Sequence, residues 1–475
     1  MADMHDDTPS ASALAAGLAA MREAQALDPL PAWETRAARL RALERLILDH
    51  RADLAAAVSA DFGHRPVAET DLLEVFPALS GIRHALRHGR RWMRTRRGFA
   101  DFWFLPARTE LRPRPLGVVG IIVPWNYPLY LAAGPLTDAL AAGNRAMLKM
   151  SEATPRFSAL FAELVARHFP AGEVAVVQGD AAIGQAFSAL PFDHLLFTGS
   201  TAVGRAVMGA AAANLTPVTL ELGGKSPAII GPGGRLGPAV ERILFGKLMN
   251  AGQTCIAPDY VLLPRARVDE FIALARATAT RMYPDFARNR DYASIASDRH
   301  YGRLARLRDE AVAAGATAHV LVDGDDDPAA RRLAPVALAG VGDAMAVMRE
   351  EIFGPLLPLV PYDTLDEAIA AVRARPHPLA LYLFDGEAAT IDRLLAALPA
   401  GGVCINDTLL HITQHGLPFG GVGESGMGAY HGETGFQALS KLTPVFRQPR
   451  LNAMAWFNPP YGTRFRSLLK LLLRH

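Results

Sequence analysis

The chain has 475 residues, of which half are apolar and a fifth are charged, and its formal net charge is +2. This length exceeds what one hydrophobic core usually supports, so we expect two or three domains. The balanced charge argues against a nucleic-acid partner, and two cysteines cannot build a disulfide scaffold.

The first part of the chain is predicted to be helical. Residues 8 to about 60 are rich in Ala, Leu, Arg and Glu at helical spacing, and Pro31 marks a helix start. One helix face would carry four apolar side chains, Leu40, Leu43, Leu46 and Ile47. This pattern indicates an N-terminal helical layer.

From Gly117 onward, short β-branched runs alternate with alanine-rich helical segments. The predicted strands are 118–123, 146–149, 174–177, 194–197 and 218–222. The predicted helices between them include 136–142 and 154–168. Such alternation predicts an α/β fold with a mostly parallel, Rossmann-like sheet that helices cover on both faces. Ligands of these sheets bind outside the carboxyl ends of the strands.

The two ends of the chain bear on its location. Met1 to Asp7 is acidic, whereas a secretory signal begins with positive charge. No run of about 18 apolar residues occurs, so we expect no membrane span and a cytoplasmic protein. The segment from Arg464 to His475 is basic and amphipathic. It could touch a membrane surface, but packing on a partner subunit or on its own domain is favoured.

Cys255 is one of only two cysteines, and it lies between small residues in the run from Asn250 to Tyr260. A thiol displayed in this way is typical of a nucleophile, although a cysteine can also be a small buried hydrophobe. Because the pKa of a free cysteine is about 8.5, a nucleophile needs a neighbouring charge or a helix N-terminus. Thr254 and Ile256 supply no charge, so activation must come from elsewhere in the fold.

Two polar residues near predicted strand ends could assist this thiol. Glu221 lies between two leucines, where partial burial would raise its pKa toward that of a useful base. The alternative is an ion pair with Lys225. Asn126 lies in the run from Pro124 to Pro128, and its amide could donate to an oxyanion, which contributes about 3 to 4 kcal/mol in comparable sites. It could also simply satisfy a turn.

A glycine-marked turn from Gly199 to Gly204 joins a predicted strand to a helix. Ser200 can cap that helix, and a helix N-terminus can receive a phosphate. The spacing is not Gly-x-Gly-x-x-Gly, and no Gly-Lys-Ser/Thr follows, so a P-loop is excluded. Beyond another strand, Glu152 could accept hydrogen bonds from ribose hydroxyls with help from Lys149. Taken alone, both residues are more simply interpreted as ordinary surface charges.

No metal site is predicted. Two His-x-x-x-His spacings occur, His84 with His88 and His411 with His415. Neither contains the glutamate of His-Glu-x-x-His, and no Cys-x-x-Cys accompanies them.

Five ordered motifs together resemble the aldehyde dehydrogenase superfamily, over essentially the whole chain after about residue 30. They are Pro124–Pro128, Leu220–Pro227, Gly252–Tyr260, Glu350–Pro355 and Pro418–Gly428. The short N-terminus and the segment from Leu417 to Gly432 look like the class 3 and fatty-aldehyde branch. Within it, the runs Leu190–Ser226 and Asn406–Gly432 look most like bacterial coniferyl aldehyde dehydrogenases.

The resemblance implies roles for the catalytic residues and for a cofactor, NAD or NADP. Cys255 would be the nucleophile and Glu221 the base, while Asn126 and the backbone N–H of Cys255 would form an oxyanion hole. Glu351 and Phe353 would hold the nicotinamide ribose and ring. The full set of expected cofactor-binding residues is Lys149, Glu152, Gly199, Ser200, Gly204, Glu351 and Phe353. The carboxylate of Glu152 would repel a 2′-phosphate and so favour NAD, although related branches accept both.

The resemblance also completes the domain prediction. Residues 1–95 and 117–220 would form the helical layer and the dinucleotide-binding domain, and residues 221–400 a second α/β domain with the thiol. A small bridging or oligomerisation lobe, residues 96–116 and 401–450, would precede a tail at 451–475. The segments 99–114 and 403–440 would build a homodimer interface.

The implied reaction is oxidation of an aldehyde to a carboxylic acid with reduction of NAD(P)⁺. Four aromatic residues could line a tunnel for a phenylpropenal such as coniferyl aldehyde, or could be plain core. They are Trp125, Tyr127, Tyr130 and Phe419. A medium- or long-chain aliphatic aldehyde is the runner-up substrate. The remaining alternatives are a reductase of activated acyl groups, which would not need Glu221 as a hydrolytic base, and a non-catalytic binding protein.

Overall fold

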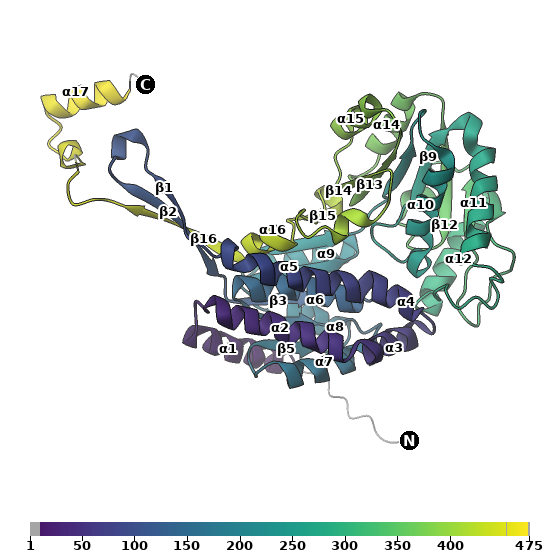
Figure 1. The fold of residues 1–475 in the computed structure, drawn as a ribbon, viewed down its shortest axis with the longest axis horizontal. Helices are drawn as coiled ribbons and strands as arrows, with labels where there is room; N and C mark the ends of the chain where they lie inside the picture. Colours follow the sequence, from purple (N-terminus) through teal and green to yellow (C-terminus); the bar gives the residue numbers. More distant parts are fainter. Residues whose placement is uncertain (1–9, 453, 474–475) are drawn as a thin grey trace.

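The computed structural model describes residues 10–452 and 454–473 and contains two lobes and a projecting ribbon (Figure 1). Each lobe is built on a mostly parallel sheet, and the ribbon is a three-stranded antiparallel sheet. The predicted α/β fold class is therefore confirmed.

The sheet of the first lobe has the strand order β15-β7-β6-β3-β4-β5, in which the edge strand β15 pairs antiparallel and the other strands pair parallel. Its strands are β3 (Val118–Ile122), β4 (Arg145–Lys149), β5 (Val174–Val177), β6 (His194–Gly199), β7 (Val218–Leu222) and β15 (Gly426–Met427). The five parallel strands confirm the predicted ones, because continuous apolar runs suit strands that are buried on both faces.

Helices cover both faces of this sheet. They are α1 (Ala11–Leu27), α6 (Pro128–Ala142), α7 (Pro155–His168), α8 (Ala181–Ser188) and α9 (Thr201–Ala212). Val118, Met147 and Leu195 share one apolar cluster with residues of α1, α8 and α9. Val119 and Leu148, which point to the opposite face, belong to the cluster that contains α6 and α7.

The predicted helical layer consists of several separate helices. They are α1, α2 (Trp33–Asp49), α3 (Arg51–Phe62), α4 (Val67–Thr70), the π-helical turn η1 (Asp71–Val75) and α5 (Phe76–Trp92). Pro31 lies two residues before α2, as predicted, and the four apolar residues predicted on one face are fully buried.

The prediction for helix 136–142 is wrong at its start. The observed α6 begins eight residues earlier, at Pro128. Proline is tolerated in a first turn, because its missing N–H has no partner there in any helix. Pro135 lies inside the same helix, so the proline-rich beginning conceals the helical pattern.

The second lobe contains a seven-stranded sheet of order β10-β11-β12-β9-β8-β13-β14, parallel except at β10. Its strands are β8 (Pro227–Ile230), β9 (Tyr260–Pro264), β10 (Thr317–Val320), β11 (Val336–Ala339), β12 (Leu356–Tyr362), β13 (Ala380–Phe384) and β14 (Gly402–Ile405). Its helices are α10 (Leu236–Leu248), α11 (Val268–Met282), α12 (Asp298–Ala313), α13 (Ala346–Arg349), α14 (Leu365–Arg373) and α15 (Ala388–Ala397).

The ribbon consists of β1 (Arg96–Phe99), β2 (Arg108–Pro115) and β16 (Ser440–Arg447). Helix α16 (Gly432–Ala438) leads into β16, and the tail contains η7 (Met454–Phe457) and α17 (Thr463–Leu472).

Residues 401–450, predicted as one lobe, are divided among three sheets. β14 completes the second sheet, β15 the first, and β16 the ribbon, because the chain crosses between the lobes here. Within the described ranges, no helix combines the length and the hydropathy that crossing a bilayer requires.

Candidate active site

Four predicted residues lie along one edge of the first sheet. Asn126 follows β3, and Glu152 follows β4. Gly199 is the last residue of β6, and Glu221 is the second-last residue of β7. Because β3, β4, β6 and β7 are parallel, their carboxyl ends meet at this edge.

Cys255 lies in a strained loop after α10. The three residues Asn250, Ala251 and Gly252 all have positive φ, at 51°, 50° and 78°. A Cβ at Gly252 would overlap the backbone oxygen of Gly354, so this position requires glycine. Such left-handed backbone is costly for non-glycine residues and is often found at functional sites.

Buried hydrogen bonds of Gln253 and Asn250 hold this loop in place. Gln253 Nε2 donates to the oxygens of Asn250 at 2.9 Å and Ser294 at 3.1 Å, and its Oε1 accepts from Ala296 N at 2.9 Å. Asn250 N donates to Glu69 Oε2 at 3.0 Å. The nucleophile is therefore presented on a fixed backbone.

The structure places Asn126 beside the thiol loop. Its Nδ2 donates to the oxygen of Gln253, two residues before Cys255, at 3.2 Å. The backbone oxygen of Asn126 accepts from Arg65 Nη1 and from Asn250 Nδ2, both at 3.2 Å. An amide nitrogen carries two hydrogens, so a second donor is left for a ligand. Asn126 thus does more than satisfy its own turn.

Glu221 is 2% exposed, and among the described residues neither carboxylate oxygen has a hydrogen-bond partner. The alternative of an ion pair with Lys225 is wrong, because Lys225 pairs with Asp259 and donates to the oxygens of Val347 and Glu350. Burial raises the pKa of Glu221 well above the usual value of a glutamate. This matches the predicted environment of a base.

The thiol itself is not activated by a cation. Burial and, to a smaller extent, the carboxylates of Glu351 and Glu221 raise the pKa of Cys255 to about 12. The charged side chains that act on Cys255 are acids, so among the described residues no cation supplies the activation that was expected from elsewhere in the fold. Cys255 is a protonated thiol at neutral pH, and its proton must be removed before it can attack.

The glycine-marked turn joins β6 to α9 as predicted. Ser200 caps the helix, and its side chain accepts from Val203 N at 3.4 Å. A Cβ at Gly204 would lie 2.6 Å from Leu222 Cδ2, so glycine lets α9 approach β7 closely. The helix N-terminus is thus open to an anion at the sheet edge.

Lys149 and Glu152 lie together at the end of β4. Lys149 is buried and donates to the oxygen of Met150 at 2.8 Å, and its Nζ lies 3.5 Å from Glu152 Oε2. Glu152 is exposed. The pair can therefore present one lysine hydrogen and one carboxylate to a ribose.

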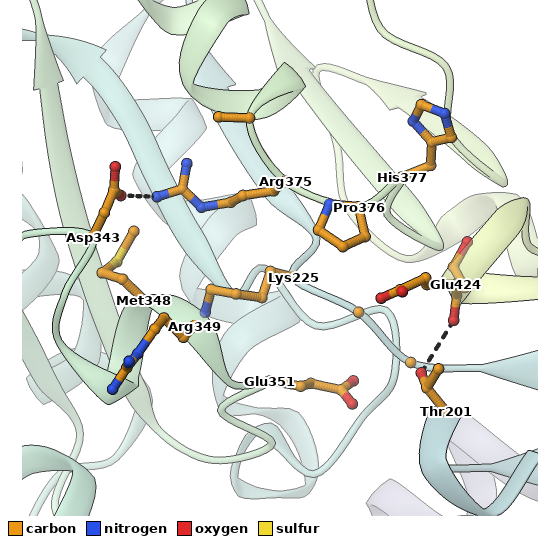
Figure 2. A pocket seen from close by; sticks show the side chains of 14 residues that line it. Thr201, Lys225, Asp343, Met348, Arg349, Glu351, Arg375, Pro376, His377 and Glu424 are labelled. Carbon is orange, nitrogen blue, oxygen red and sulfur yellow. Dashed lines mark hydrogen bonds and ion pairs between the residues drawn. The ribbon is translucent and has the colours of Figure 1, made fainter. Parts of the chain in front are cut away.

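A cleft of about 420 Å³ lies between the turn after β7 and residues of the second lobe (Figure 2). The first lobe contributes Thr201, Gly223 and Gly224. Thr201 Oγ1 donates to the backbone oxygen of Glu424 at 3.1 Å, which joins α9 to the segment 418–428. The full lining also includes Lys225, Asp343, Met348, Arg349, Glu351, Ala374, Arg375, Pro376, His377, Glu424 and Ser425.

Glu351 directs its carboxylate into this cleft (Figure 2). Its Oε1 is buried without a partner among the described residues, and burial raises its pKa to about 8. A Cβ at Gly223 would overlap its other oxygen. A carboxylate with a vacant oxygen in a cleft fits the hydroxyls of a ribose. The predicted cofactor role of Glu351 therefore fits the structure.

Phe353 has a positive φ of 53°, and its ring meets the edge of Trp125 at 5.4 Å between centroids. Trp125 in turn stacks on His300 at 4.7 Å. The predicted nicotinamide residue and one predicted substrate residue are thus in contact.

Residues 4–445 match the aldehyde dehydrogenase family. The chain belongs to this family. It is an NAD(P)-dependent aldehyde dehydrogenase, and the predicted resemblance, enzyme class and nicotinamide cofactor are confirmed, whereas the alternative of a non-catalytic protein is wrong.

Similar proteins cover nearly the whole chain. A probable coniferyl aldehyde dehydrogenase of Pseudomonas aeruginosa is 50% identical over 462 residues, which are 97% of this chain and 96% of that protein. A coniferyl aldehyde dehydrogenase of a Pseudomonas species is 44% identical over 468 residues, 98% of this chain and 97% of that one. The substrate-bound structure of Staphylococcus aureus AldH matches with a TM-score of 0.91 at 36% identity, covering 96% and 99% of the two chains.

The four predicted substrate residues of this aldehyde dehydrogenase divide into two groups. Trp125 and Tyr127 lie at the thiol loop, and the hydroxyls of Tyr127 and Thr254 are hydrogen-bonded at 2.6 Å. Tyr130 and Phe419 meet at His431: the Tyr130 hydroxyl lies 3.2 Å from His431 Nε2, and Phe419 stacks on the same imidazole at 5.5 Å.

Sequence reasoning missed Tyr430 and Tyr382. Tyr430 is 1% exposed, its hydroxyl has no partner among the described residues, and its raised pKa reflects burial and then Tyr130, Glu221 and Cys255. Tyr382 donates its hydroxyl to the oxygen of Ile256. Tyr382 lies in no recognisable motif, and Tyr430 lies within the run Asn406–Gly432 without being singled out there, so only the fold shows that both lie near the thiol.

In the described part of the chain, no group of three or more His, Cys, Asp or Glu side chains is placed to hold a metal ion. The structure does bring the two histidine pairs together, with the rings of His84 and His415 6.1 Å apart.

Proposed function

We propose that this enzyme oxidises a phenylpropenal such as coniferyl aldehyde to the corresponding acid, ferulate, with NAD⁺ as the preferred cofactor. The partnerless carboxylate of Glu221 beside Cys255 carries the mechanistic part of the proposal. The substrate rests on the names of the similar Pseudomonas proteins and on aromatic side chains around the thiol.

In the first step, Cys255 Sγ bonds to the aldehyde carbon as the thiol proton leaves, and the carbonyl electron pair moves to oxygen. The resulting thiohemiacetal carries an oxyanion. The free amide hydrogen of Asn126 and the backbone N–H of Cys255 stabilise that charge. The thiol proton passes through water to the solvent, so this step does not use Glu221, which stays ionised for the hydrolysis.

The thiohemiacetal then loses a hydride and becomes a thioester on Cys255. A nicotinamide dinucleotide, when bound, would supply the oxidising power as the hydride acceptor. Glu351 would hold a ribose through the oxygen that has no partner, and the turn from Gly199 to Gly204 would receive the diphosphate at the N-terminus of α9.

Hydrolysis completes the cycle. Glu221 removes a proton from a water molecule, and the oxygen of that water bonds to the thioester carbon. The C–S bond breaks and the acid leaves, and the Cys255 thiolate takes the proton from Glu221, which returns both groups to their starting forms. A desolvated carboxylate with a raised pKa is a stronger base than an exposed one, which suits this step.

We also propose a homodimer that assembles through the ribbon. Its β1–β2 hairpin projects from the lobes (Figure 1) and exposes Phe99, Phe102 and Phe104. Exposed aromatic residues on a projecting arm are typical of an interface.

An aldehyde panel tests the substrate. Turnover of coniferyl aldehyde and of a saturated aldehyde of similar length would be followed by absorbance of the reduced cofactor, with NAD⁺ and NADP⁺ in turn. The proposal predicts a higher kcat/KM for coniferyl aldehyde with NAD⁺. A higher value for the saturated aldehyde would favour an aliphatic aldehyde dehydrogenase instead. Cys255→Ala should show no turnover with any aldehyde.

A further inference from the structure

The tail beyond the ribbon ends in helix α17, Thr463–Leu472. Figure 1 shows α17 beyond the end of the ribbon, away from both lobes. None of its residues is buried. Of the two expected arrangements, packing on its own domain is therefore not seen for the described residues, and packing on a partner subunit is left as the rival to a lipid surface.

The helix has one apolar face. Phe465, Leu468, Leu469 and Leu472 follow the i, i+3, i+4, i+7 spacing that aligns side chains on one side of a helix. The ring of Phe465 contacts Tyr461 at 4.5 Å and Phe457 at 6.3 Å between centroids. An aromatic cluster thus extends the apolar face toward η7, where Trp456 is also exposed.

The other face is basic. Arg464, Arg466 and Lys470 are exposed, and among the described residues none of them pairs with a carboxylate. The excess of positive charge extends beyond the helix, because residues 434–475 contain seven Lys or Arg and no Asp or Glu. The whole chain carries only +2, so positive charge is concentrated in this segment.

We propose that α17 lies flat on an anionic lipid surface. Its leucines and the neighbouring aromatic rings would enter the boundary between headgroups and acyl chains, while the three cations meet the lipid phosphates. The same segment of a second copy contains no acidic residue, so two such segments would repel each other rather than pair. Charge complementarity therefore favours the lipid surface over a second copy.

Co-sedimentation of the full-length enzyme with vesicles tests the proposal. Vesicles of phosphatidylcholine mixed with phosphatidylglycerol should bind the enzyme, and raised salt should weaken that binding. A Leu468→Asp/Leu472→Asp variant should remain in the supernatant. An Arg464→Gln/Arg466→Gln/Lys470→Gln variant should bind roughly a hundredfold more weakly. The matched control Leu27→Asp changes an exposed leucine elsewhere and should bind like the wild type.

Folding and oligomeric state are followed in parallel. Each variant should retain aldehyde dehydrogenase activity in solution, which shows that the lobes are intact. The proposal is overturned if the wild type does not bind the anionic vesicles, or if the leucine variant binds them equally well. It is also overturned if the leucine variant instead converts dimers to monomers in mass photometry, since a second copy would then cover the helix.

Discussion

A carboxylate buried without a partner is costly, because desolvation disfavours its charged form. Glu221 occupies such a position in β7, and Glu351 has one vacant oxygen in the cleft. Glu74 provides a contrast, because this buried carboxylate pairs with Arg65 and accepts from two backbone N–H groups. The contrast indicates that Glu221 is kept for chemistry with a ligand.

The change Glu221→Gln should preserve the first turnover and slow the following ones. An amide cannot take a proton from water, so a burst of reduced cofactor should precede a steady state slowed roughly 100- to 10,000-fold. Stopped-flow absorbance measures both phases. The control Glu163→Gln, an exposed glutamate of α7, should behave like the wild type. An unaltered steady-state rate in Glu221→Gln would show that Glu221 is not the base that activates water.

The pH dependence should follow from the raised pKa of Glu221. Only the ionised form is a base, so the turnover of the wild type should rise as pH increases through that raised pKa. The turnover of Glu221→Gln should not show this rise. A buried acid with a raised pKa stabilises the fold at low pH, and that stability is lost as pH rises through the raised pKa. At neutral pH and above, denaturation should therefore show no loss of unfolding free energy in the variant, whereas a structural carboxylate would show one.

Glu152 bears on the choice between NAD⁺ and NADP⁺. Its exposed carboxylate lies at the end of β4, 3.5 Å from Lys149, where a 2′-phosphate would meet both charges. Glu152→Gln should lower the KM for NADP⁺ roughly five- to tenfold and leave that for NAD⁺ nearly unchanged, since an exposed charge interaction is worth about 1 kcal/mol. Steady-state kinetics with both cofactors measure the effect. An equal change for the two cofactors would contradict the proposed contact.

At the scale of elements, the loop after α10 shows where sequence reasoning stops. Cys255 could be singled out because a rare thiol stood among small residues, and the strands before Asn126 and Glu221 could be predicted from their apolar runs. The left-handed conformation of Asn250 and Ala251 could not be predicted from the sequence, because tertiary hydrogen bonds impose it. Tyr430 reaches the thiol in the same way, through the return of the chain at β15.

The change Gly252→Ala should damage this loop. A Cβ would overlap the oxygen of Gly354, and φ is 78°, so we expect a loss of about 1 to 3 kcal/mol of unfolding free energy and reduced kcat/KM. Gly237→Ala in α10 is the matched control, because nothing lies within 4 Å of its Cβ position. Denaturation and aldehyde oxidation measure both variants. Wild-type stability and activity in Gly252→Ala would show that the loop is not constrained in this way.

At the scale of the whole molecule, alternation of strands and helices was enough to predict two α/β units, but not how the chain divides after residue 400. Short strands such as β14 and β15 carry little local signal, and each is fixed by its neighbour, β13 or β7. Local sequence patterns do not encode such long-range pairing.

The ribbon provides the prediction at this scale. Phe99 is 82% exposed and Phe102 75%, so Phe99→Asp/Phe102→Asp should split the proposed dimer without unfolding either lobe. Mass photometry should show dimers for the wild type and for the control Leu27→Asp, and monomers for the double variant. A double variant that remains dimeric would place the interface elsewhere.

The central claim is that Cys255 carries the acyl group that Glu221 releases. Its most direct test is rapid quenching of Glu221→Gln with coniferyl aldehyde and NAD⁺, followed by peptide mass spectrometry. The account predicts a feruloyl adduct on the peptide that contains Cys255 and none on the peptide that contains Cys404, the other cysteine. An unmodified Cys255 after a full burst of reduced cofactor would contradict it.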